Sequence, residues 1–276
     1  MMRTYFNTHT FDKLTKENDI CITNCPQEAD LLVLGAARVD YSNFSSLKAV
    51  YRFGIGSENI DFEFLKRRDI PVYFPSEATK NILYEATANF TVFGILSMLY
   101  QGAFGDADLW KKKERDYLGE KIVLVIGTGN IGRRVAEKLK AFMKVKIYDI
   151  SRNKPEELGP LIRLADVITI HIPLNKQTEG FFGKEKLSWA KPDTLFVNTA
   201  RGALYDENSL YDKLSTTSCR AFFDVFWKEP YEGKLKSLGK DKFFMTPHSA
   251  SNIKEFVQAG FNEILKLIED LNNGKA

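Results

Sequence analysis

The sequence has few cysteines, and their placement argues against a structural metal site. Only Cys21, Cys25 and Cys219 occur in 276 residues. Cys21 and Cys25 have the spacing of half a metal site, but no second His or Cys pair completes a ligand set. We therefore expect no metal. Reduced thiols of this kind favour a cytoplasmic location.

The chain also lacks an excess of charge of either sign. Its 39 Lys and Arg residues and 36 Asp and Glu residues leave a formal net charge of +3. This small balance gives no support to nucleic-acid binding, which needs basic residues gathered on one face. It is compatible with an anionic cofactor or substrate. The hydrophobic fraction of 44% and the charged fraction of 27% are typical of a soluble globular protein.

Neither a secretory signal nor a membrane span is expected. Residues 1–7 show no apolar run followed by a small-residue cleavage site. The most apolar stretch, residues 81–100, is interrupted by polar residues such as Glu85 and Asn89, which indicates a buried helix. The sequence also has no internal repeat and no low-complexity tract.

Short apolar runs alternate with amphipathic stretches along most of the chain. This alternation is typical of parallel sheets covered by helices on both faces, so the predicted fold class is α/β. The predicted helices include residues 62–68, 81–100, 133–142, 208–214 and a last one around 261–271. The predicted strands are residues 31–35, 48–51, 70–73, 121–126, 145–148, 166–172, 194–198, 220–225 and 243–246.

One predicted strand leads directly into a glycine-rich turn. Residues 127–132 read Gly-Thr-Gly-Asn-Ile-Gly, and an amphipathic helix follows them. Gly127 permits the tight turn, Gly129 lets the backbone approach a pyrophosphate, and Gly132 allows close packing of helix and strand. The N–H groups and the dipole of the helix N-terminus favour phosphate. This segment predicts a dinucleotide site, with a glycine turn that binds no nucleotide as the weaker alternative.

The type of dinucleotide is indicated by the next strand. That strand ends on Asp149, about 20 residues past the last glycine, where an acidic side chain binds the adenosine ribose hydroxyls. Its charge repels a 2′-phosphate, which favours NAD over NADP. Arg152 argues in the other direction, because an arginine nearby can accommodate that phosphate.

Three further residues stand where open α/β sheets bind ligands. Arg201, Glu229 and His248 each come shortly after one of the last three predicted strands, at its carboxyl end. Taken singly, they are explained as well by a solvated loop charge, a surface carboxylate and a buried histidine with its hydrogen bonds satisfied.

Taken together and in order, these segments resemble the D-isomer-specific 2-hydroxyacid dehydrogenase family. The resemblance covers roughly residues 48 to 275, and the first 45 residues contribute nothing to it. The matching segments are residues 54–61 (GIGSENID), 127–132 (GTGNIG), 171–174 (HIPL) with Thr178, 198–202 (NTARG), 224–230 (DVFWKEP) and 247–248 (PH).

The resemblance implies an oxidoreductase that transfers a hydride between NAD(H) and a small anionic 2-hydroxy or 2-keto acid. His248 would move the proton, and Glu229 would fix the tautomer of its ring and favour the imidazolium form. Arg201 would bind the substrate carboxylate or polarise the carbonyl. The implied substrate-binding residues are Gly54, Ile55, Gly56 and Arg52. The implied cofactor-binding residues are Gly127, Gly129, Asn130, Ile131, Gly132, Asp149, His171, Pro173, Thr178, Thr199 and Asp224, with Asp224 orienting the nicotinamide carboxamide.

Arg52 has two interpretations of equal weight: a contact for a second anionic group of the substrate, or a salt-bridged surface arginine. Other positions depart from the family pattern. Asn130 stands where an arginine is frequent, Tyr205 where an aliphatic residue is common, and Ser249 where glycine is frequent. These departures leave the identity of the acid open.

The resemblance also implies two doubly wound parallel-sheet domains, Rossmann-like or flavodoxin-like, with a cleft between them. Residues 1–86 with 251–276 would form the substrate domain, and residues 87–250 the NAD-binding domain. Members of the family form homodimers through the nucleotide domain, so we expect a homodimer.

Two other functional interpretations stay open. Relatives that oxidise formate characteristically replace the glutamate of the dyad, so Glu229 argues against formate, whereas a phosphite dehydrogenase is not excluded. An NAD(H)-binding regulatory protein that reports the cofactor to a partner would keep the same fold, because fold does not fix function.

Overall fold

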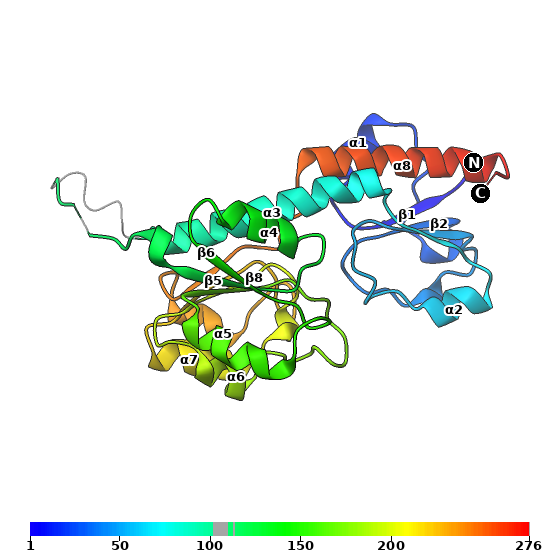
Figure 1. Ribbon diagram of the computed structural model, residues 1–276. Helices are drawn as coiled ribbons and strands as arrows, with labels where there is room; N and C mark the ends of the chain where they lie inside the picture. Colours follow the sequence, from blue (N-terminus) through cyan, green and yellow to red (C-terminus); the bar gives the residue numbers. More distant parts are fainter. Residues whose placement is uncertain (102–109, 113, 276) are drawn as a thin grey trace. The chain divides into compact units, whose positions relative to one another are not determined.

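The computed structural model describes residues 1–101, 110–112 and 114–275 (Figure 1). The chain forms two compact units, one of Met1–Leu83 with Asn252–Ala276 and one of Tyr84–Ser251. We call them the small unit and the large unit. The functional roles expected for two such domains stay predictions.

The large unit is built on a six-stranded parallel sheet in the order β10-β9-β8-β7-β5-β6. All of its strands coincide with predicted apolar runs, and the predicted α/β class is confirmed. The strands are β5 (Ile122–Ile126), β6 (Lys144–Tyr148), β7 (Val167–Ile170), β8 (Leu195–Asn198), β9 (Arg220–Phe223) and β10 (Phe243–Met245).

Helices cover both faces of this sheet (Figure 1). Because successive side chains of a strand point to opposite faces, β5 sends Val123 and Val125 into one core and Leu124 and Ile126 into the other. The first core is closed by α3 (Glu77–Leu99) and α4 (Gly132–Leu139), and the second by α5 (Leu158–Leu164), α6 (Lys184–Trp189) and α7 (Glu207–Thr216).

The strand order reverses at β5, and this point positions the ligand site. β5 pairs with β6 on one side and with β7 on the other, and the later strands follow on the β7 side. The connections therefore lie on opposite faces: α4 leads to β6 on one face, and α5 leads back to β7 on the other. Open sheets bind ligands outside the carboxyl ends of the strands at such a reversal. Here Gly127 and His171 occupy that place, directly after β5 and β7.

The small unit contains a four-stranded parallel sheet whose order follows the sequence, β1-β2-β3-β4. One face packs against the C-terminal helix α8 (Lys254–Asn272) and the short α1 (Asp12–Glu17), and the other packs against α2 (Phe62–Arg67). The strands are β1 (Thr4–Asn7), β2 (Leu31–Leu34), β3 (Ala49–Arg52) and β4 (Val72–Tyr73). β1 was not predicted, because this edge strand has partly exposed side chains and no apolar run.

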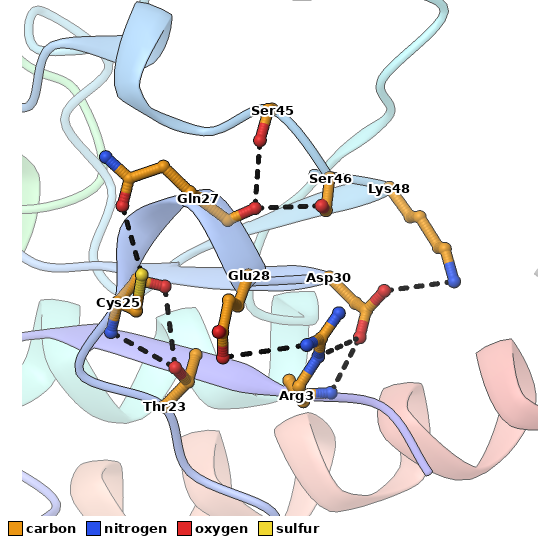
Figure 2. A network of polar contacts seen from close by, with 9 residues as sticks. All are labelled: Arg3, Thr23, Cys25, Gln27, Glu28, Asp30, Ser45, Ser46 and Lys48. Carbon is orange, nitrogen blue, oxygen red and sulfur yellow. Dashed lines mark hydrogen bonds and ion pairs between the residues drawn. The ribbon is translucent and has the colours of Figure 1, made fainter.

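Asp30 joins the amino-terminal ends of the strands of this sheet (Figure 2). Its carboxylate accepts a hydrogen bond from the Arg3 backbone N–H at 2.9 Å and pairs with Lys48 Nζ at 3.0 Å. Burial acts to raise the pKa of Asp30, but these donors outweigh it and hold the pKa below its ordinary value. Since the three residues precede β1, β2 and β3, Asp30 helps to fix the register of these strands.

The helix α3 is long and apolar enough to cross a membrane by length and composition alone, a test that buried core helices also pass. In the large unit it is packed as a core helix, with Ala88, Ile95 and Met98 at most 1% exposed. A Cβ at Gly94 would lie 2.3 Å from the ring of Phe222 in β9. The buried helix predicted for residues 81–100 is therefore present, and it begins earlier, at Glu77.

Two buried tyrosines of the large unit differ in how their hydroxyl groups are satisfied. Tyr205 stacks on Phe182 at a centroid distance of 4.8 Å, and among the residues that the structure describes its hydroxyl has no hydrogen-bond partner. Tyr231 donates its hydroxyl proton to Glu207 Oε1 at 2.6 Å and accepts the Leu235 N–H at 3.2 Å.

We expect Tyr205→Phe and Tyr231→Phe to change stability in opposite directions. Tyr205→Phe removes a buried polar group without a partner and should raise the free energy of unfolding by about 1 kcal/mol. Tyr231→Phe leaves Glu207 and Leu235 without their partner and should lower it by about 1–2 kcal/mol. Urea unfolding of the two variants and the parent measures both values. A loss of stability in Tyr205→Phe would contradict the unsatisfied hydroxyl.

Candidate active site

The turn after β5 has the backbone shape that its glycines predict. Gly127 has a φ of +92° and donates its N–H to Tyr148 O at 2.8 Å. A Cβ at Gly127 would lie 2.5 Å from the carbonyl oxygen of His171, and one at Gly132 would lie 2.0 Å from that of Gly127. At Gly129, no described atom comes within 4 Å of the Cβ position. The turn itself requires the outer two glycines, and Gly129 leaves open space beside the backbone.

This open space fits the pyrophosphate of a dinucleotide. The helix α4 begins at Gly132, so its N-terminal N–H groups and the positive end of its dipole lie at the turn. Asn130 accepts a hydrogen bond from Arg133 Nη2 at 2.9 Å through its side chain, and from the Arg134 guanidinium through its carbonyl. Two arginines of the first turn of α4 thus bring positive charge to the place where Asn130 itself has none.

Asp149 follows β6 and is joined to this turn. Its Oδ1 accepts the hydroxyl of Ser151 at 2.6 Å and the N–H of Ser151 at 3.0 Å, and its Oδ2 accepts the hydroxyl of Thr128. These donors lower the pKa of Asp149 to about 2, and the nearby charge of Arg152 lowers it further. Asp149 is therefore ionised at neutral pH, with lone pairs left to accept ribose hydroxyls.

The segment after β7 is held in shape by Thr178. The Thr178 hydroxyl donates to Pro173 O at 2.6 Å and accepts the Asn175 N–H at 2.9 Å. The ring of His171 lies with Nε2 2.9 Å from Thr169 Oγ1. Burial lowers the pKa of His171 to about 3, so this ring is neutral at physiological pH. His171 therefore forms a wall of the glycine turn and carries no charge there.

The loop after β8 carries Arg201 and is shaped by Asn198. Asn198 Nδ2 donates to Arg201 O at 2.8 Å, and its Oδ1 accepts the Ala200 N–H at 2.9 Å. The Arg201 guanidinium donates to Ala200 O at 2.7 Å. A Cβ at Gly202 would lie 2.2 Å from the carbonyl carbon of Phe226. Glycine at this position therefore lets the loops after β8 and β9 lie in direct contact.

Thr199 in the same loop is hydrogen-bonded to α3. Its Oγ1 lies 2.8 Å from Thr91 Oγ1, and the Thr91 hydroxyl donates to Thr87 O at 2.8 Å. A hydroxyl has only one proton to donate, so Thr199 must be the donor to Thr91. The Thr199 oxygen can then act only as an acceptor toward a bound molecule.

His248 and Glu229 form a hydrogen-bonded pair. His248 Nδ1 lies 2.8 Å from Glu229 Oε2, and the other carboxylate oxygen accepts the Phe226 N–H at 3.0 Å. Both side chains are 34% exposed. Because Nδ1 is engaged by Glu229, Nε2 is the ring atom that can exchange a proton with a bound molecule.

The surroundings of this pair fix the charge of Glu229. Burial acts to raise the pKa of Glu229, but the hydrogen bond and charge of His248, with the Phe226 N–H and Arg201, outweigh it and lower the pKa. Glu229 is therefore negative at neutral pH, and a carboxylate at this distance favours the imidazolium form of the ring.

Asp224 lies directly after β9 and is 0% exposed. Its Oδ1 accepts the Thr246 hydroxyl at 2.5 Å and the Ser249 N–H at 2.7 Å, and its Oδ2 accepts the Ala250 N–H at 2.9 Å. Burial raises the pKa of Asp224, and the three hydrogen bonds act against that rise. The structure thus places Asp224 against the turn that carries His248.

In the small unit, the loop after β3 is shaped by Arg52. The guanidinium donates to Gly56 O at 2.8 Å, to Leu34 O at 3.2 Å and to Phe53 O. Arg52 is only 5% exposed, so its interpretation as a surface arginine is wrong. Its printed bonds go to backbone carbonyls, which gives it a structural role in this loop.

The loop Gly54–Gly56 has the geometry of a donor site. Gly54 has a φ of +123°, a conformation that favours glycine. Within the part of the chain that the structure describes, the N–H groups of Gly54, Ile55 and Gly56 make no hydrogen bond. Successive backbone N–H groups of this kind form concavities that bind anions. The loop can therefore bind a carboxylate through its backbone.

The structure brings most of the predicted site residues of the large unit to one edge of its sheet. Arg201, Glu229 and His248 follow β8, β9 and β10, which are neighbours in the sheet, and the glycine turn follows β5. Residues 54–56 belong to the small unit. Over residues 1–101, 110–112 and 114–275, no group of three His, Cys, Asp or Glu side chains could hold a metal.

Several polar partners in this site were not predicted from the sequence. They are Thr128, Thr91, Thr246 and Ser249, which bond to Asp149, Thr199 and Asp224. Their signal in the sequence is weak, because threonine and serine are ordinary loop residues and one partner lies on a distant helix.

Known proteins resemble the chain in both sequence and structure. The family model described as D-isomer specific 2-hydroxyacid dehydrogenase, NAD binding domain, matches residues 100–250. A glyoxylate reductase of Thermococcus litoralis is 32% identical over 262 residues, covering 83% of this chain and 76% of that protein. A D-3-phosphoglycerate dehydrogenase of Methanocaldococcus jannaschii is 30% identical over 268 residues, covering 90% of this chain and 51% of that protein. The chain thus spans about half the length of that second relative.

The fold is shared with solved structures over the full chain. The crystal structure of D-lactate dehydrogenase from Aquifex aeolicus, complexed with NAD and lactic acid, superposes with a TM-score of 0.81 at 23% identity. The match covers 99% of this chain and 96% of that one. The resemblance expected from the motifs is confirmed, and so is NAD as the cofactor of the domain.

Removing the charge of Asp149 should weaken the discrimination against NADPH. In Asp149→Ala no carboxylate repels the 2′-phosphate, so the ratio of kcat/KM for NADPH to that for NADH should rise about tenfold or more. Ser151→Ala is the matched control, because it removes one hydroxyl donor and keeps the carboxylate. The ratio is measured with both cofactors at fixed keto acid. An unchanged ratio in Asp149→Ala would show that Asp149 does not read the ribose.

Proposed function

Because the chain belongs to the D-isomer specific 2-hydroxyacid dehydrogenase family, a family of NAD-dependent enzymes, we propose that it interconverts a small 2-keto acid and the corresponding 2-hydroxy acid. The observation that carries this proposal is the His248–Glu229 pair, at 2.8 Å, on the loops next to the one that carries Arg201. Hydroxy-acid chemistry needs a proton carrier and an anion-binding group, and these residues supply both.

The cofactor would be held by the residues at the reversal of the sheet. The open space at Gly129 and the N-terminus of α4 suit the pyrophosphate, and ionised Asp149 suits the adenosine ribose. When bound, NAD(H) supplies or accepts the hydride; the chain supplies placement and proton transfer. Thr199, which can only accept, suits an N–H donor of the cofactor.

In the proposed reaction, His248 moves the proton at the substrate oxygen. In the direction of reduction, protonated Nε2 donates to the carbonyl oxygen as the hydroxyl forms, and in oxidation neutral Nε2 takes the proton back. Glu229 holds Nδ1 as the protonated nitrogen in both directions and stabilises the imidazolium. The ring therefore presents the same atom to the substrate throughout.

Arg201 would bind the substrate carboxylate. Its guanidinium carries donors in a planar fork that matches a carboxylate, and one donor already holds the loop through Ala200 O. The buried Asn198 fixes the backbone of this loop, so the arginine is placed by the strand end of β8 and not by flexible chain. The homodimer and the cytoplasmic location expected from the sequence stay predictions.

The chain should oxidise NADH in the presence of 2-keto acids. The decisive measurement uses glyoxylate, hydroxypyruvate, pyruvate and larger 2-keto acids, with formate and phosphite tested in the opposite direction with NAD. We expect turnover with at least one keto acid and none with formate. Turnover with phosphite alone, or NADH binding without turnover on any of these compounds, would remove the proposed reaction.

His248→Ala is the internal control for this panel. Loss of the proton carrier should lower kcat of keto-acid reduction roughly 10²-fold or more. NADH affinity, followed by fluorescence, should stay within about a factor of 3, because His248 is assigned to the proton and not to the cofactor. His9→Ala, a change at an exposed histidine of the small unit, should leave both quantities unaltered.

Glu229→Gln should change the pH dependence of the reaction. The amide keeps the size of the side chain but has no charge to stabilise the imidazolium, so the protonated ring is lost at lower pH. The alkaline limb of kcat/KM for keto-acid reduction should therefore move to lower pH by about 1 unit. The measurement is a pH–rate profile of parent and variant between pH 5 and 9. A limb at the same pH in both proteins would exclude the proposed role of Glu229.

A further inference from the structure

The backbone of the turn that carries His248 adopts an unfavourable conformation. His248 has a φ of +51°, which few residues other than glycine adopt. Such a conformation persists only where the surrounding structure fixes it, and it is commonest at functional sites. The Thr246 N–H donates to Phe223 O at 3.0 Å, and the His248 N–H donates to Thr246 O at 2.9 Å. These bonds hold the start of the turn and leave its far side to other partners.

The far side of the turn is bonded to Asp224. The Ser249 N–H at 2.7 Å and the Ala250 N–H at 2.9 Å both point at this carboxylate, and the Thr246 hydroxyl reaches it at 2.5 Å. The three donors come from both sides of His248 in the sequence. One buried side chain thus closes the turn around the catalytic ring.

We propose that Asp224 is a positioning residue, which holds the His248 turn in the conformation that pairs the ring with Glu229. It acts through the Thr246 hydroxyl and the Ser249 and Ala250 N–H groups. This inference rests on the proposed function, since the conformation matters for catalysis only if His248 moves the proton.

The pattern of donors requires an ionised carboxylate. Oδ1 accepts two hydrogen bonds and Oδ2 accepts one, so each oxygen faces an N–H or O–H group. An asparagine amide would turn its NH₂ group toward one of these donors in either orientation. A protonated aspartic acid would meet the same conflict at the oxygen that carries its proton. Asp224 is therefore not interchangeable with its isosteric amide.

A direct contact of Asp224 with the cofactor makes a different prediction. An ionised carboxylate has about four lone-pair sites, and the turn takes three of them. A contact with the N–H of the nicotinamide carboxamide through the remaining site would make Asp224 a cofactor ligand. Its loss would then weaken NADH binding, and the Thr246 hydroxyl would have little effect on rate.

The first test changes Thr246 and leaves Asp224 in place. Thr246→Val removes the hydroxyl donor at nearly constant size, and Thr246→Ser is the matched control that keeps it. We expect kcat of keto-acid reduction to fall about 5–30-fold in Thr246→Val and to stay within about a factor of 2 in Thr246→Ser. The Kd for NADH should stay within about a factor of 3 in both. Equal kcat values for the two variants would overturn the proposal.

The second test separates positioning from cofactor contact. Asp224→Asn is assayed with NADH and with its 3-acetylpyridine analogue, whose acetyl group has no N–H to donate. If Asp224 acts through the turn, the fall in kcat should be the same with both cofactors, about 10–100-fold. A fall with NADH and none with the analogue would identify Asp224 as a carboxamide ligand and contradict the proposal.

A third readout does not depend on activity. Amide hydrogen exchange of Ser249 and Ala250 in the cofactor-free chain should be faster in Thr246→Val and in Asp224→Asn than in the parent and Thr246→Ser. Unchanged exchange in both variants would show that Asp224 does not hold the turn. If the parent reduces no keto acid while exchange responds as expected, the proposed function fails and the structural role of Asp224 stands.

Discussion

The site depends on one constraint: β8, β9 and β10 are parallel neighbours, so their carboxyl ends meet at one edge of the sheet. Residues far apart in the sequence, Arg201, Glu229 and His248, are each the product of one strand end. The edge alone would leave three separate loops. Gly202 brings two of them into contact, because its missing side chain admits the backbone of Phe226. The hydrogen bond from His248 to Glu229 then joins the third loop to the second. A parallel sheet, one glycine and one hydrogen bond thus assemble the arrangement.

Two carboxylates beside the same histidine turn have opposite pKa shifts, and the contrast follows from their surroundings. Glu229 is partly exposed and faces a cation, so its pKa is lowered despite burial. Asp224 is fully buried, and its neutral and backbone donors do not offset the loss of solvent, so its pKa is raised. Environment therefore separates two chemically similar groups into different roles. Glu229 faces the ring and can respond to its proton, whereas Asp224 faces the backbone and fixes where the ring stands.

The sequence predicts the parts of this protein that local pattern determines. The apolar runs of the large sheet and the spacing of Gly127, Gly129 and Gly132 reflect burial and backbone geometry, which act over a few residues. The order of Arg201, Glu229 and His248 could be interpreted because each follows a predicted strand. The remaining features depend on tertiary contacts. The edge strand β1 has no apolar run, the guanidinium of Arg52 reaches carbonyls of two loops, and Asp224 bonds to a turn some twenty residues away in the sequence. No local pattern contains these partners.

The same distinction explains the positions at which the chain departs from the family pattern. Tyr205 lies in the core behind the Arg201 loop, 1% exposed among aromatic rings, so its substitution concerns packing. Ser249 contributes its backbone N–H to Asp224, a bond that a glycine would make equally well. Asn130 lacks a charge, but Arg133 and Arg134 bond to it from the first turn of α4 and keep positive charge at the pyrophosphate turn. Each departure thus leaves the proton carrier, the anion-binding arginine and the dinucleotide turn in place. The chemistry that the site can perform is set by groups that these substitutions do not touch.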